Sequence, residues 1–412
     1  MPERMRTLAI VGASARAAAF SALRAGYRVV AADLFADADL ARVAPVTRVR
    51  QYPDGLADWL AHTECDAWLY TGALENYPDL VDRMAALRPL AGNRGPALRA
   101  ARDPLHLQTV LSAGGVPFPE TRTVAEGLPL DGTWLCKTRS SASGSGVWRL
   151  DGRPALERAK REAALFQRCV AGEPAAALFA IRGCRPGDPG QGSENARAAL
   201  LGVTRQLMSD DPAHPFQYVG SQGPIGLTAP VGVQLATLGS LLATQLGLVG
   251  LVGVDLILTP ESLHVVEINP RYTASVELVE RFTGREVLAG VDGGQGWVGD
   301  GAPRLEGSEG RPAGGSEERR VGDPPARSGC FAKTICFATG DVTISAAFHE
   351  WALGQSSLDP QRCWLADIPH AGEQIPASRP VLTLFAAAET APACQEQLAA
   401  RLAEVKARLY DD

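Results

Sequence analysis

Two apolar segments, LVGVDLIL (251–258) and LHVVEI (263–268), are separated only by the turn sequence TPES. This pattern predicts a β-hairpin. Residues i and i+2 of a strand point to the same face, so Glu267 and Asn269 are expected to project together. A three-residue turn would place Asp255 directly opposite Glu267, and a four-residue turn would leave it one position off. The hairpin therefore brings two carboxylates and an amide close together.

Neighbouring carboxylates repel each other and destabilise a fold unless a cation or a proton lies between them. Carboxylate and amide oxygens are hard ligands that suit Mg²⁺ or Mn²⁺ bound together with substrate phosphates. Arg271 follows directly and offers a fixed cation for a transferring phosphoryl group or an acyl phosphate. Asp255, Glu267 and Asn269 are thus candidate metal ligands, and Arg271 is a candidate catalytic residue. The alternative is a polar hairpin tip near solvent.

A second candidate element is WLCKTRSSASGSGVW (134–148). Lys137 lies inside its apolar strand, where an unpaired lysine is costly to bury. The small residues that follow offer flexible backbone N–H groups and hydroxyls, which can approach phosphates closely. The segment lacks the GxxxxGK[ST] pattern of a P-loop, and by itself such a sequence is more often a hairpin turn. Lys137 is therefore a candidate phosphate-binding and catalytic residue only in combination with the carboxylate hairpin.

The rest of the chain has an α/β pattern. Residues 7–100 alternate strand and helix, which predicts a parallel sheet. The first strand-to-helix turn, at Gly12, lacks GxGxxG and is more typical of tight packing than of an anion site. The helix LERAKREAALF (156–166) is expected to precede a group of strands. Residues 291–329 are rich in glycine, proline and charge, which predicts a disordered insertion. Strands and a C-terminal amphipathic helix follow.

Composition excludes several classes of protein. The 412 residues carry a net charge of −6, so no basic excess points to nucleic acid or to a membrane surface. There is no apolar run of transmembrane length and no signal-peptide pattern, so a cytoplasmic protein is expected. The eight cysteines are scattered without a CxxC pair, which is typical of free thiols in a reducing compartment.

A strand lysine, a glycine-rich loop, a hinge and then a carboxylate hairpin with Asn and Arg resemble the order found in the ATP-grasp superfamily. LYTGALENYPDLVDRMAALRPLAGN and LADIPHAGEQIPASRPVLTLFAAA resemble stretches of the predicted ATP-dependent carboligases related to biotin carboxylase. The resemblance implies a Rossmann-like parallel-sheet domain (1–100) and a two-lobed α+β ATP-grasp domain (101–290). After the insertion (291–329), it implies a small β-rich, biotin-carboxylase-like subdomain (330–412).

The resemblance also implies roles for single residues. Lys137 would contact the ATP phosphates, and the backbone of the hinge would face the adenine. Arg271 would stabilise the phosphorylated intermediate. The full set implied by the resemblance is a flap of Ser143, Gly144, Ser145 and Gly146, adenine contacts at Cys169 and Val170, a ribose contact at Glu173, and Mg²⁺ ligands at Asp255, Glu267 and Asn269.

Two departures from the relatives affect the nucleotide contacts. Relatives often have Asp-Lys where this chain has Asp103-Pro104, so one phosphate-binding lysine is missing. A Glu is common at the hinge where Arg168 stands. Both departures concern the nucleotide contacts and leave the candidate metal ligands intact.

The activity implied by the resemblance is an ATP-dependent ligase that converts a small-molecule carboxylate to an acyl phosphate and joins it to an amine. An amino-acid ligation in making a tetrahydromethanopterin- or methanofuran-type cofactor is the specific case implied, and the relatives allow a homodimer. Bicarbonate activation with a separate carrier, and a catalytically silent nucleotide-binding protein, stay as alternatives. The absent GxGxxG argues against an oxidoreductase, although Asp33 ends the second strand. His349 and His370 qualify as bases only by residue type and are not expected to act.

Overall fold

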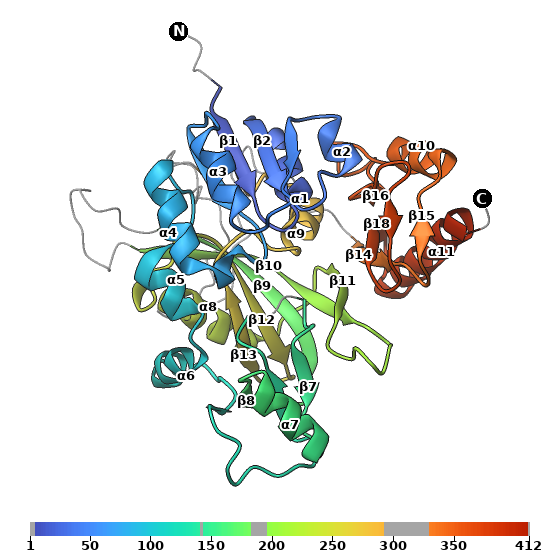
Figure 1. The fold of residues 1–412 in the computed structure, drawn as a ribbon. Coiled ribbons are helices and arrows are strands. Elements are labelled where there is room, and N and C mark those ends of the chain that lie inside the picture. The colour runs from blue at the N-terminus through green and yellow to red at the C-terminus, as the bar shows by residue number, and fades with distance from the viewer. Residues whose placement is uncertain (1–4, 141–142, 183–195, 292–328, 411–412) are drawn as a thin grey trace, which may run out of the picture.

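The computed structural model describes residues 5–140, 143–182, 196–291 and 329–410. The predicted disordered insertion lies outside the described residues except for its two ends, and so does Cys184. The described part contains a parallel N-terminal sheet, a small antiparallel sheet and a large antiparallel sheet, with helices packed on them (Figure 1). This architecture confirms the predicted α/β fold class.

Parallel strands in the order β3-β2-β1-β4 form the N-terminal sheet. A parallel sheet is buried on both faces, and β1 shows why its sequence is apolar throughout. Leu8 and Ile10 share one core with helix α1, whereas Ala9 and Val11 share another with α3 and α4. The elements of this region are β1 (Thr7–Val11), α1 (Arg16–Arg24), β2 (Arg28–Asp33), α2 (Ala38–Ala41), β3 (Val46–Arg48), α3 (Gly55–Ala61), β4 (Ala67–Tyr70), the 3₁₀ helix η1 (Leu74–Asn76), α4 (Pro78–Leu87), α5 (Gly95–Ala101) and α6 (Pro104–Ala113).

The turn after β1 is a close-packed turn, in agreement with its sequence. Gly12 has a φ of +151°, and a Cβ there would lie only 2.1 Å from Thr71 Oγ1. Asp33 at the end of β2 is fully buried, and its carboxylate accepts N–H bonds from Ala15 (2.7 Å), Phe35 (3.0 Å) and Ala36 (2.7 Å). Asp33 therefore holds the first turn against the loop after β2 and is not free to bind a ribose.

The small antiparallel sheet has the order β5-β8-β6-β7, and helix α7 packs against β6. Its elements are β5 (Thr121–Arg122), β6 (Trp134–Lys137), β7 (Val147–Arg149), α7 (Arg153–Arg161) and β8 (Leu165–Arg168). The predicted helix over 156–166 is wrong at both ends. Ala163 has a φ of +47°, which ends the helix, and the apolar Leu165 and Phe166 are buried in strand β8 instead.

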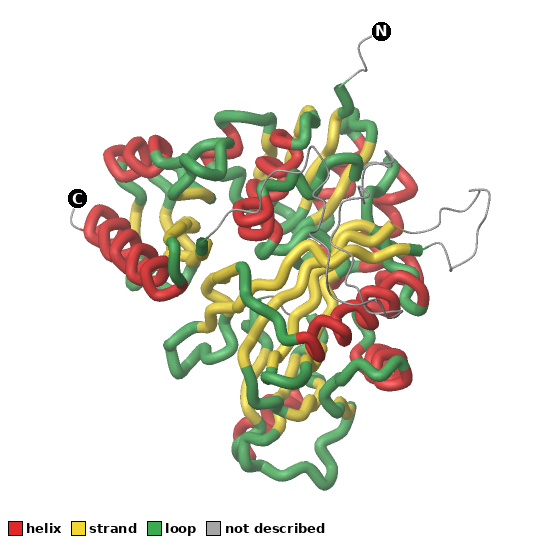
Figure 2. Tube along the Cα trace, turned by 180° about the vertical axis from the view of Figure 1, so that it is seen from behind, coloured by secondary structure: helices red, strands yellow, loops and turns green. Residues whose placement is uncertain are grey.

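The large antiparallel sheet has the order β13-β12-β9-β10-β11-β14-β18-β16, and its strands run through the middle of Figure 2. Helix α8 packs against β9 and β10, and α9 packs against β10, β11 and β14. The elements are β9 (Glu173–Arg182), β10 (Arg197–Met208), β11 (Tyr218–Gly223), α8 (Ala229–Thr244), β12 (Gly250–Leu258), β13 (Leu263–Asn269), α9 (Val276–Thr283), β14 (Cys330–Phe337), β16 (Leu365–Ala366) and β18 (Pro380–Ala388).

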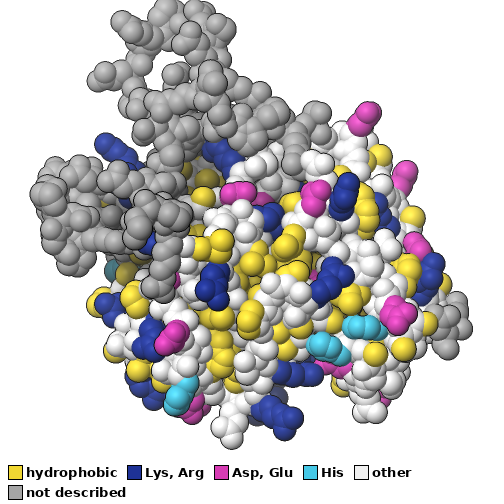
Figure 3. All heavy atoms as spheres, turned by 90° about the horizontal axis from the view of Figure 1, so that it is seen from above, with side chains coloured by type: hydrophobic (Ala, Val, Ile, Leu, Met, Phe, Trp, Pro, Cys, Tyr) yellow, Lys and Arg dark blue, Asp and Glu magenta, His cyan; other side chains and the backbone are white. Residues whose placement is uncertain are grey.

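The C-terminal segment contributes three strands to this large sheet, so it shares a sheet with the central part of the chain. Its remaining elements are β15 (Val342–Thr343), α10 (Ala346–Gly354), β17 (Gln374–Ile375) and α11 (Ala391–Tyr410), and α11 packs on β14 and β18. In the part of the chain that the structure describes, no helix combines the length and apolarity needed to cross a membrane. Basic and acidic side chains are interspersed on the face shown in Figure 3.

Candidate active site

The β12–β13 hairpin brings the predicted metal ligands together through a β-bulge. Its ladder begins at the pair Leu258 and Leu263, so the turn has four residues, and a regular ladder would place Asp255 opposite Val266. The register shifts by one residue at this point, and Asp255 pairs with Glu267 instead. Val266 is the extra residue of the bulge. The two carboxylates therefore stand directly opposite each other despite the longer turn.

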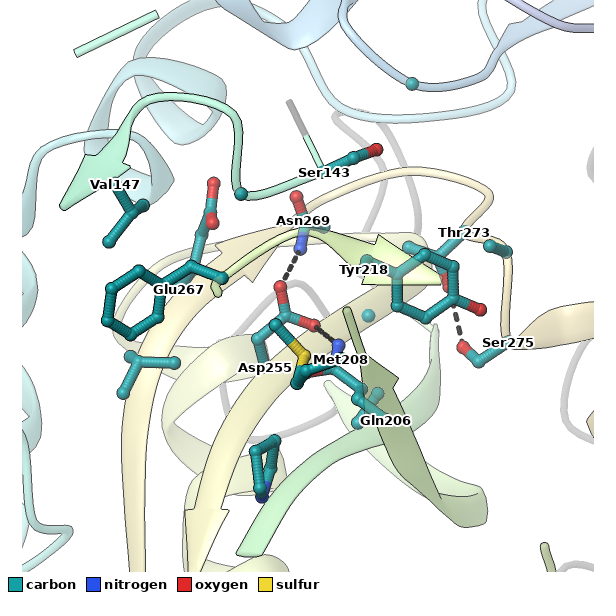
Figure 4. A pocket seen from close by; sticks show the side chains of 18 of the residues that line it. Ser143, Val147, Gln206, Met208, Tyr218, Asp255, Glu267, Asn269, Thr273 and Ser275 are labelled. Carbon is teal, nitrogen blue, oxygen red and sulfur yellow. Dashed lines mark hydrogen bonds between the residues drawn. The ribbon is translucent and has the colours of Figure 1, made fainter. Parts of the chain in front are cut away.

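Amide groups surround the Asp255 carboxylate (Figure 4). Gln206 Nε2 donates to Oδ1 at 2.8 Å, and Asn269 Nδ2 donates to Oδ2 at 3.0 Å. Burial and the neighbouring Glu267 raise the pKa of Asp255 above its usual range. For Glu267 burial acts in the same direction, but Arg102 and Lys137 outweigh it and lower the pKa. The two carboxylates repel each other when both are ionised, and a cation bound between them would relieve this repulsion.

Arg271 is fixed by the N-terminal domain. Its Nη2 lies 2.6 Å from Oε1 of Glu75 in η1, and the two side chains are only 14% and 3% exposed. Nη2 also donates to Asn269 Oδ1 at 3.1 Å, and Nη1 donates to the Tyr272 carbonyl at 3.1 Å. The buried Nε of Arg271 has no protein partner. A donor held in this way is available to a bound anion.

Lys137 points from β6 toward the same place. Its Nζ donates to Gln167 Oε1 at 3.0 Å and to the carbonyl of Val266, the bulge residue, at 3.3 Å. Burial lowers the pKa of the lysine, and Glu267 and Asp255 act against that shift. The bulge therefore does two things, because it aligns the carboxylates and turns a carbonyl toward the lysine.

Arg102, at the end of α5, is a site residue that the sequence reasoning did not single out. Its Nη1 lies 2.6 Å from Glu267 Oε1, and its Nη2 donates to Asn76 Oδ1 at 3.0 Å. It directly precedes the Asp103-Pro104 pair, where the sequence resemblance implies a lysine that this chain does not have. The missing lysine is the only sequence signal that pointed to this region, and the guanidinium of Arg102 supplies a cation there.

The predicted flap lies against the β10–β11 connection. The Ser143 carbonyl accepts the Tyr218 N–H at 3.1 Å, and the Gly146 carbonyl accepts the Thr138 N–H at 2.9 Å. Gly144 has a φ of +77°, and a Cβ there would lie 1.7 Å from the Phe216 carbonyl oxygen. Ser143 and Gly144 line the cavity described below, and Ser143 projects above Asn269 in Figure 4. Ser145 and Gly146 are not among its lining residues.

Some of the predicted hinge residues between β8 and β9 line the cavity, and one does not. Cys169 and Val170 line the cavity, and the Cys169 N–H donates to the Thr133 carbonyl at 2.9 Å. Glu173 is not among the lining residues, and Arg205 binds its carboxylate through two bonds of 2.6 and 2.9 Å. The predicted adenine contacts thus face the cavity, whereas the predicted ribose contact is engaged by an arginine.

One continuous cavity of about 1210 Å³ joins these groups to the N-terminal domain. Single small-molecule sites usually measure about 300–1,000 Å³, so this cavity has room for a nucleotide and a second substrate. Its lining also includes Ser14, Thr71 and Gly72 of the N-terminal loops. His349 and His370 are not among its lining residues, and each has a ring nitrogen 2.8 Å from a backbone carbonyl, as expected for structural histidines.

Comparison with known protein families identifies the domain that contains this site. The model of the ATP-grasp domain family matches residues 101–275. The chain carries an ATP-grasp domain. This match covers the flap, the hinge and the carboxylate hairpin, and it confirms the resemblance seen in the sequence.

Solved ATP-grasp structures share the fold of nearly the whole chain. An L-amino acid ligase from Bacillus licheniformis is 16% identical, with a TM-score of 0.66 over 98% of both chains. An N5-carboxyaminoimidazole ribonucleotide synthetase in complex with ADP is 15% identical, with a TM-score of 0.64 over 98% of this chain and 97% of the other. A biotin carboxylase from Campylobacter jejuni is 14% identical, with a TM-score of 0.63 over 94% of this chain and 89% of the other. No curated protein matches the chain.

The TM-scores and the domain match together show the ATP-grasp fold related to biotin carboxylase, in which ATP-dependent ligases and carboxylases both occur. The donor atoms of the ATP-grasp hairpin fit the metal expected there. Mg²⁺ is usually held by one or two carboxylates together with substrate phosphates, and Asp255 and Glu267 provide two carboxylates. The Asn269 amide oxygen, which accepts from Arg271 in this structure, would complete a set of hard ligands.

Proposed function

We propose that the protein is an ATP-dependent carboxylate–amine ligase. In the proposed reaction, a carboxylate oxygen of the first substrate attacks the γ-phosphorus of ATP, and the bond to the ADP oxygen breaks. An amine then attacks the carbonyl carbon of the acyl phosphate. The bond to the phosphate oxygen breaks, a proton leaves the nitrogen, and an amide and inorganic phosphate result. Bound Mg²⁺ or Mn²⁺ would neutralise charge on the phosphates.

The observation that carries this proposal is the placement of three cations around the carboxylate pair in one cavity. Lys137, Arg102 and Arg271 all line it, and each comes from a different part of the chain. Phosphoryl transfer needs mainly positioning and charge neutralisation. Lys137 and Arg102 would bind phosphate oxygens, with Arg102 in place of the missing lysine. Arg271, with its unpartnered Nε, would bind the acyl phosphate.

The size of the cavity supports two substrates beside each other. It extends past Arg271 to the loops of the N-terminal sheet, where a second substrate would bind away from the flap. We propose an amino acid as one of the two substrates, and a ligation step in one-carbon cofactor biosynthesis is the specific case that the sequence resemblance implies. A catalytically silent protein would have no need of three cations and two carboxylates gathered in one cavity, because partly burying charges is costly without a ligand.

Nucleotide-product analysis tests the proposal. The protein would be incubated with MgATP and, separately, with pooled amino acids plus amines, with pooled carboxylic acids plus amino acids, and with bicarbonate. ADP and phosphate formed only with an amino-acid pool are expected. Turnover with bicarbonate alone would indicate a carboxylase-like enzyme instead, and AMP with pyrophosphate would refute the acyl phosphate. The Glu267→Gln variant, which keeps the shape of the side chain, is the matched control for contaminating ATPases.

A further inference from the structure

Charged side chains of several elements line the end of the cavity that lies away from the flap, between the N-terminal and C-terminal parts of the chain. Arg16 begins α1, Asp37 precedes α2, Glu277 lies in α9, Lys333 lies in β14 and Asp367 follows β16. These elements lie side by side where the N-terminal and C-terminal parts meet (Figure 1), and the Ala38 N–H donates to the Ile368 carbonyl at 2.8 Å. None of these groups has a role in the proposed phosphoryl transfer.

Both cations of this cluster are already bound to carboxylates. Arg16 is 1% exposed; its Nε donates to Asp367 Oδ1 at 2.8 Å and its Nη1 donates to Glu277 Oε1 at 2.5 Å. Its Nη2 bonds to the second oxygens of the same two carboxylates, at 3.1 and 3.2 Å. Lys333 Nζ donates to Glu277 Oε2 at 3.4 Å. Among the residues that the structure describes, this end of the cavity therefore offers no free cation to an anionic substrate.

Other carboxylates in the cluster are also satisfied by the protein. Asp33 accepts only backbone N–H groups, as described above. Asp39 Oδ1 accepts the Ile368 N–H at 3.1 Å, and its Oδ2 accepts the Asp367 N–H and the Ser356 hydroxyl, both at 3.2 Å. These bonds fix the loops around the cavity and leave the oxygens with little capacity for a ligand.

Asp37 differs from its neighbours. It is 6% exposed and lines the cavity, and its buried Oδ2 has no hydrogen-bond partner. It stands at the N-cap position of α2, where an aspartate normally accepts a backbone N–H of the helix, yet it makes no capping bond. A buried carboxylate oxygen without a donor is destabilising, which indicates that its partner comes with a ligand.

The chemistry of the site selects the ligand. A divalent metal needs several free oxygens, and in this cluster the other carboxylates are engaged by Arg16, Lys333 or backbone N–H groups. A protonated primary amine needs only a carboxylate acceptor and negative surroundings, because it carries a single positive charge and three N–H donors. Burial, together with Asp367, Asp39 and Asp33, raises the pKa of Asp37, and Arg16 opposes the shift. A cation bound beside Asp37 would lower this pKa again.

We propose that Asp37 is the recognition residue for a protonated amino group of the amine substrate, which its Oδ2 accepts as a hydrogen-bond and ion-pair partner. The proposal rests on the proposed function, because it assigns the amine to the end of the cavity opposite the phosphate-binding cations. The ammonium at Asp37 cannot itself attack the acyl phosphate, so the substrate class is compounds that carry a second, reactive amino group, such as diamines and lysine.

Calorimetric titration without nucleotide tests the proposal separately from turnover. The probes are 1,4-diaminobutane and L-lysine, with 1,4-butanediol as the neutral analogue. We expect the wild type to bind the cationic probes and not the diol, and Asp37→Asn to bind them at least tenfold more weakly. Asp58→Asn, an exposed position in α3 of the same domain, is the matched control and should bind like the wild type.

A second readout separates recognition from a structural role. Asp37→Asn should melt no lower than the wild type without ligand, because an amide keeps the shape of the protonated carboxyl group and carries no charge in these negative surroundings. Titrations of the wild type in buffers of different ionisation enthalpy should show proton release on binding, as Asp37 ionises beside the cation, and this test does not need the variant to fold. Equal binding of diamine and diol, no proton release, or unchanged affinity in Asp37→Asn would overturn the proposal. ADP release with amino-acid pools would still stand in that case.

Discussion

The flap offers a sharp test, because Gly144 and Gly127 have similar φ angles and different surroundings. Gly144 has a φ of +77° and Gly127 a φ of +74°, but a Cβ would lie 1.7 Å from the Phe216 carbonyl oxygen at Gly144 and would meet nothing within 4 Å at Gly127. Alanine in the left-handed region costs roughly 1–2 kcal/mol at either position. Any further effect of Gly144→Ala therefore reports the clash in the flap.

The size of that further effect follows from the contact. An alanine at Gly144 must move the flap by roughly 2 Å to restore an ordinary contact of about 3.5 Å. This movement breaks the bond between the Ser143 carbonyl and the Tyr218 N–H, which contributes about 1 kcal/mol, and it loosens the packing over the cavity. We expect the closed flap to be destabilised by about 2 kcal/mol relative to Gly127→Ala, which corresponds to roughly 30-fold weaker binding of MgATP.

The assay is calorimetric binding of MgATP and of a non-hydrolysable analogue to both variants. Melting temperatures should fall slightly in both variants through the shared backbone cost, and further in Gly144→Ala, which also loses the bond between Ser143 and Tyr218. The affinity for nucleotide should fall only in Gly144→Ala. Equal nucleotide affinity in the two variants would refute the assignment of 143–146 as the flap that closes over the phosphates.

Three further predictions concern charge. Asp255→Asn and Glu267→Gln should each abolish ATP turnover while the protein stays folded, as measured by ADP release and circular dichroism; full activity in either would contradict the metal assignment. Arg102→Ala should weaken MgATP binding about tenfold, whereas Arg102→Lys should keep most of the affinity. An equal loss of MgATP affinity in the two variants would show that the charge at this position does not contribute to binding. Although burial opposes it, Arg16 lowers the pKa of Glu277 to about 2. Glu277→Gln should therefore cost about 3–5 kcal/mol at neutral pH, and the difference from wild type should shrink as the pH falls from about 4.5 to 2, in thermal melts at each pH. A difference that is constant with pH would show that Glu277 is not the ionised partner.

The carboxylate hairpin shows what sequence spacing can and cannot settle. The alternation of strand residues predicted correctly that Glu267 and Asn269 share a face. It left the position of Asp255 open, because the four-residue turn by itself predicts an offset of one residue. The bulge at Val266 that removes the offset is stabilised by tertiary contacts, since the Val266 carbonyl accepts from Lys137 and the Val265 N–H donates to the Pro117 carbonyl at 2.9 Å. Neither contact is visible in the hairpin sequence.

Strand β11 and the partners of the site cations were missed for a similar reason. The sequence YVGSQG has no apolar alternation, and it is a strand because it lies between β10 and β14. Gly220 is required there, because a Cβ would lie 2.1 Å from the Lys333 carbonyl oxygen. Glu75 and Arg102 come from segments far from the hairpin in sequence. Only the folded chain shows that they pair with Arg271 and Glu267.

The distribution of charge along the cavity argues for two substrates of opposite character. Near the flap, Lys137, Arg102 and Arg271 stand beside Asp255, Glu267 and Glu75, and a bound Mg²⁺ would add the positive charge that a triphosphate and an acyl phosphate need there. At the other end, Arg16 is neutralised by its own carboxylates and Asp37 is left without a donor. In a low-dielectric cavity such a gradient orients ligands, so an anionic group is favoured at one end and an ammonium at the other. The carboxylate to be activated and the amine to be joined would therefore bind at fixed positions in the cavity. The atoms that form the new bond would lie between Arg271 and the loops of the N-terminal domain.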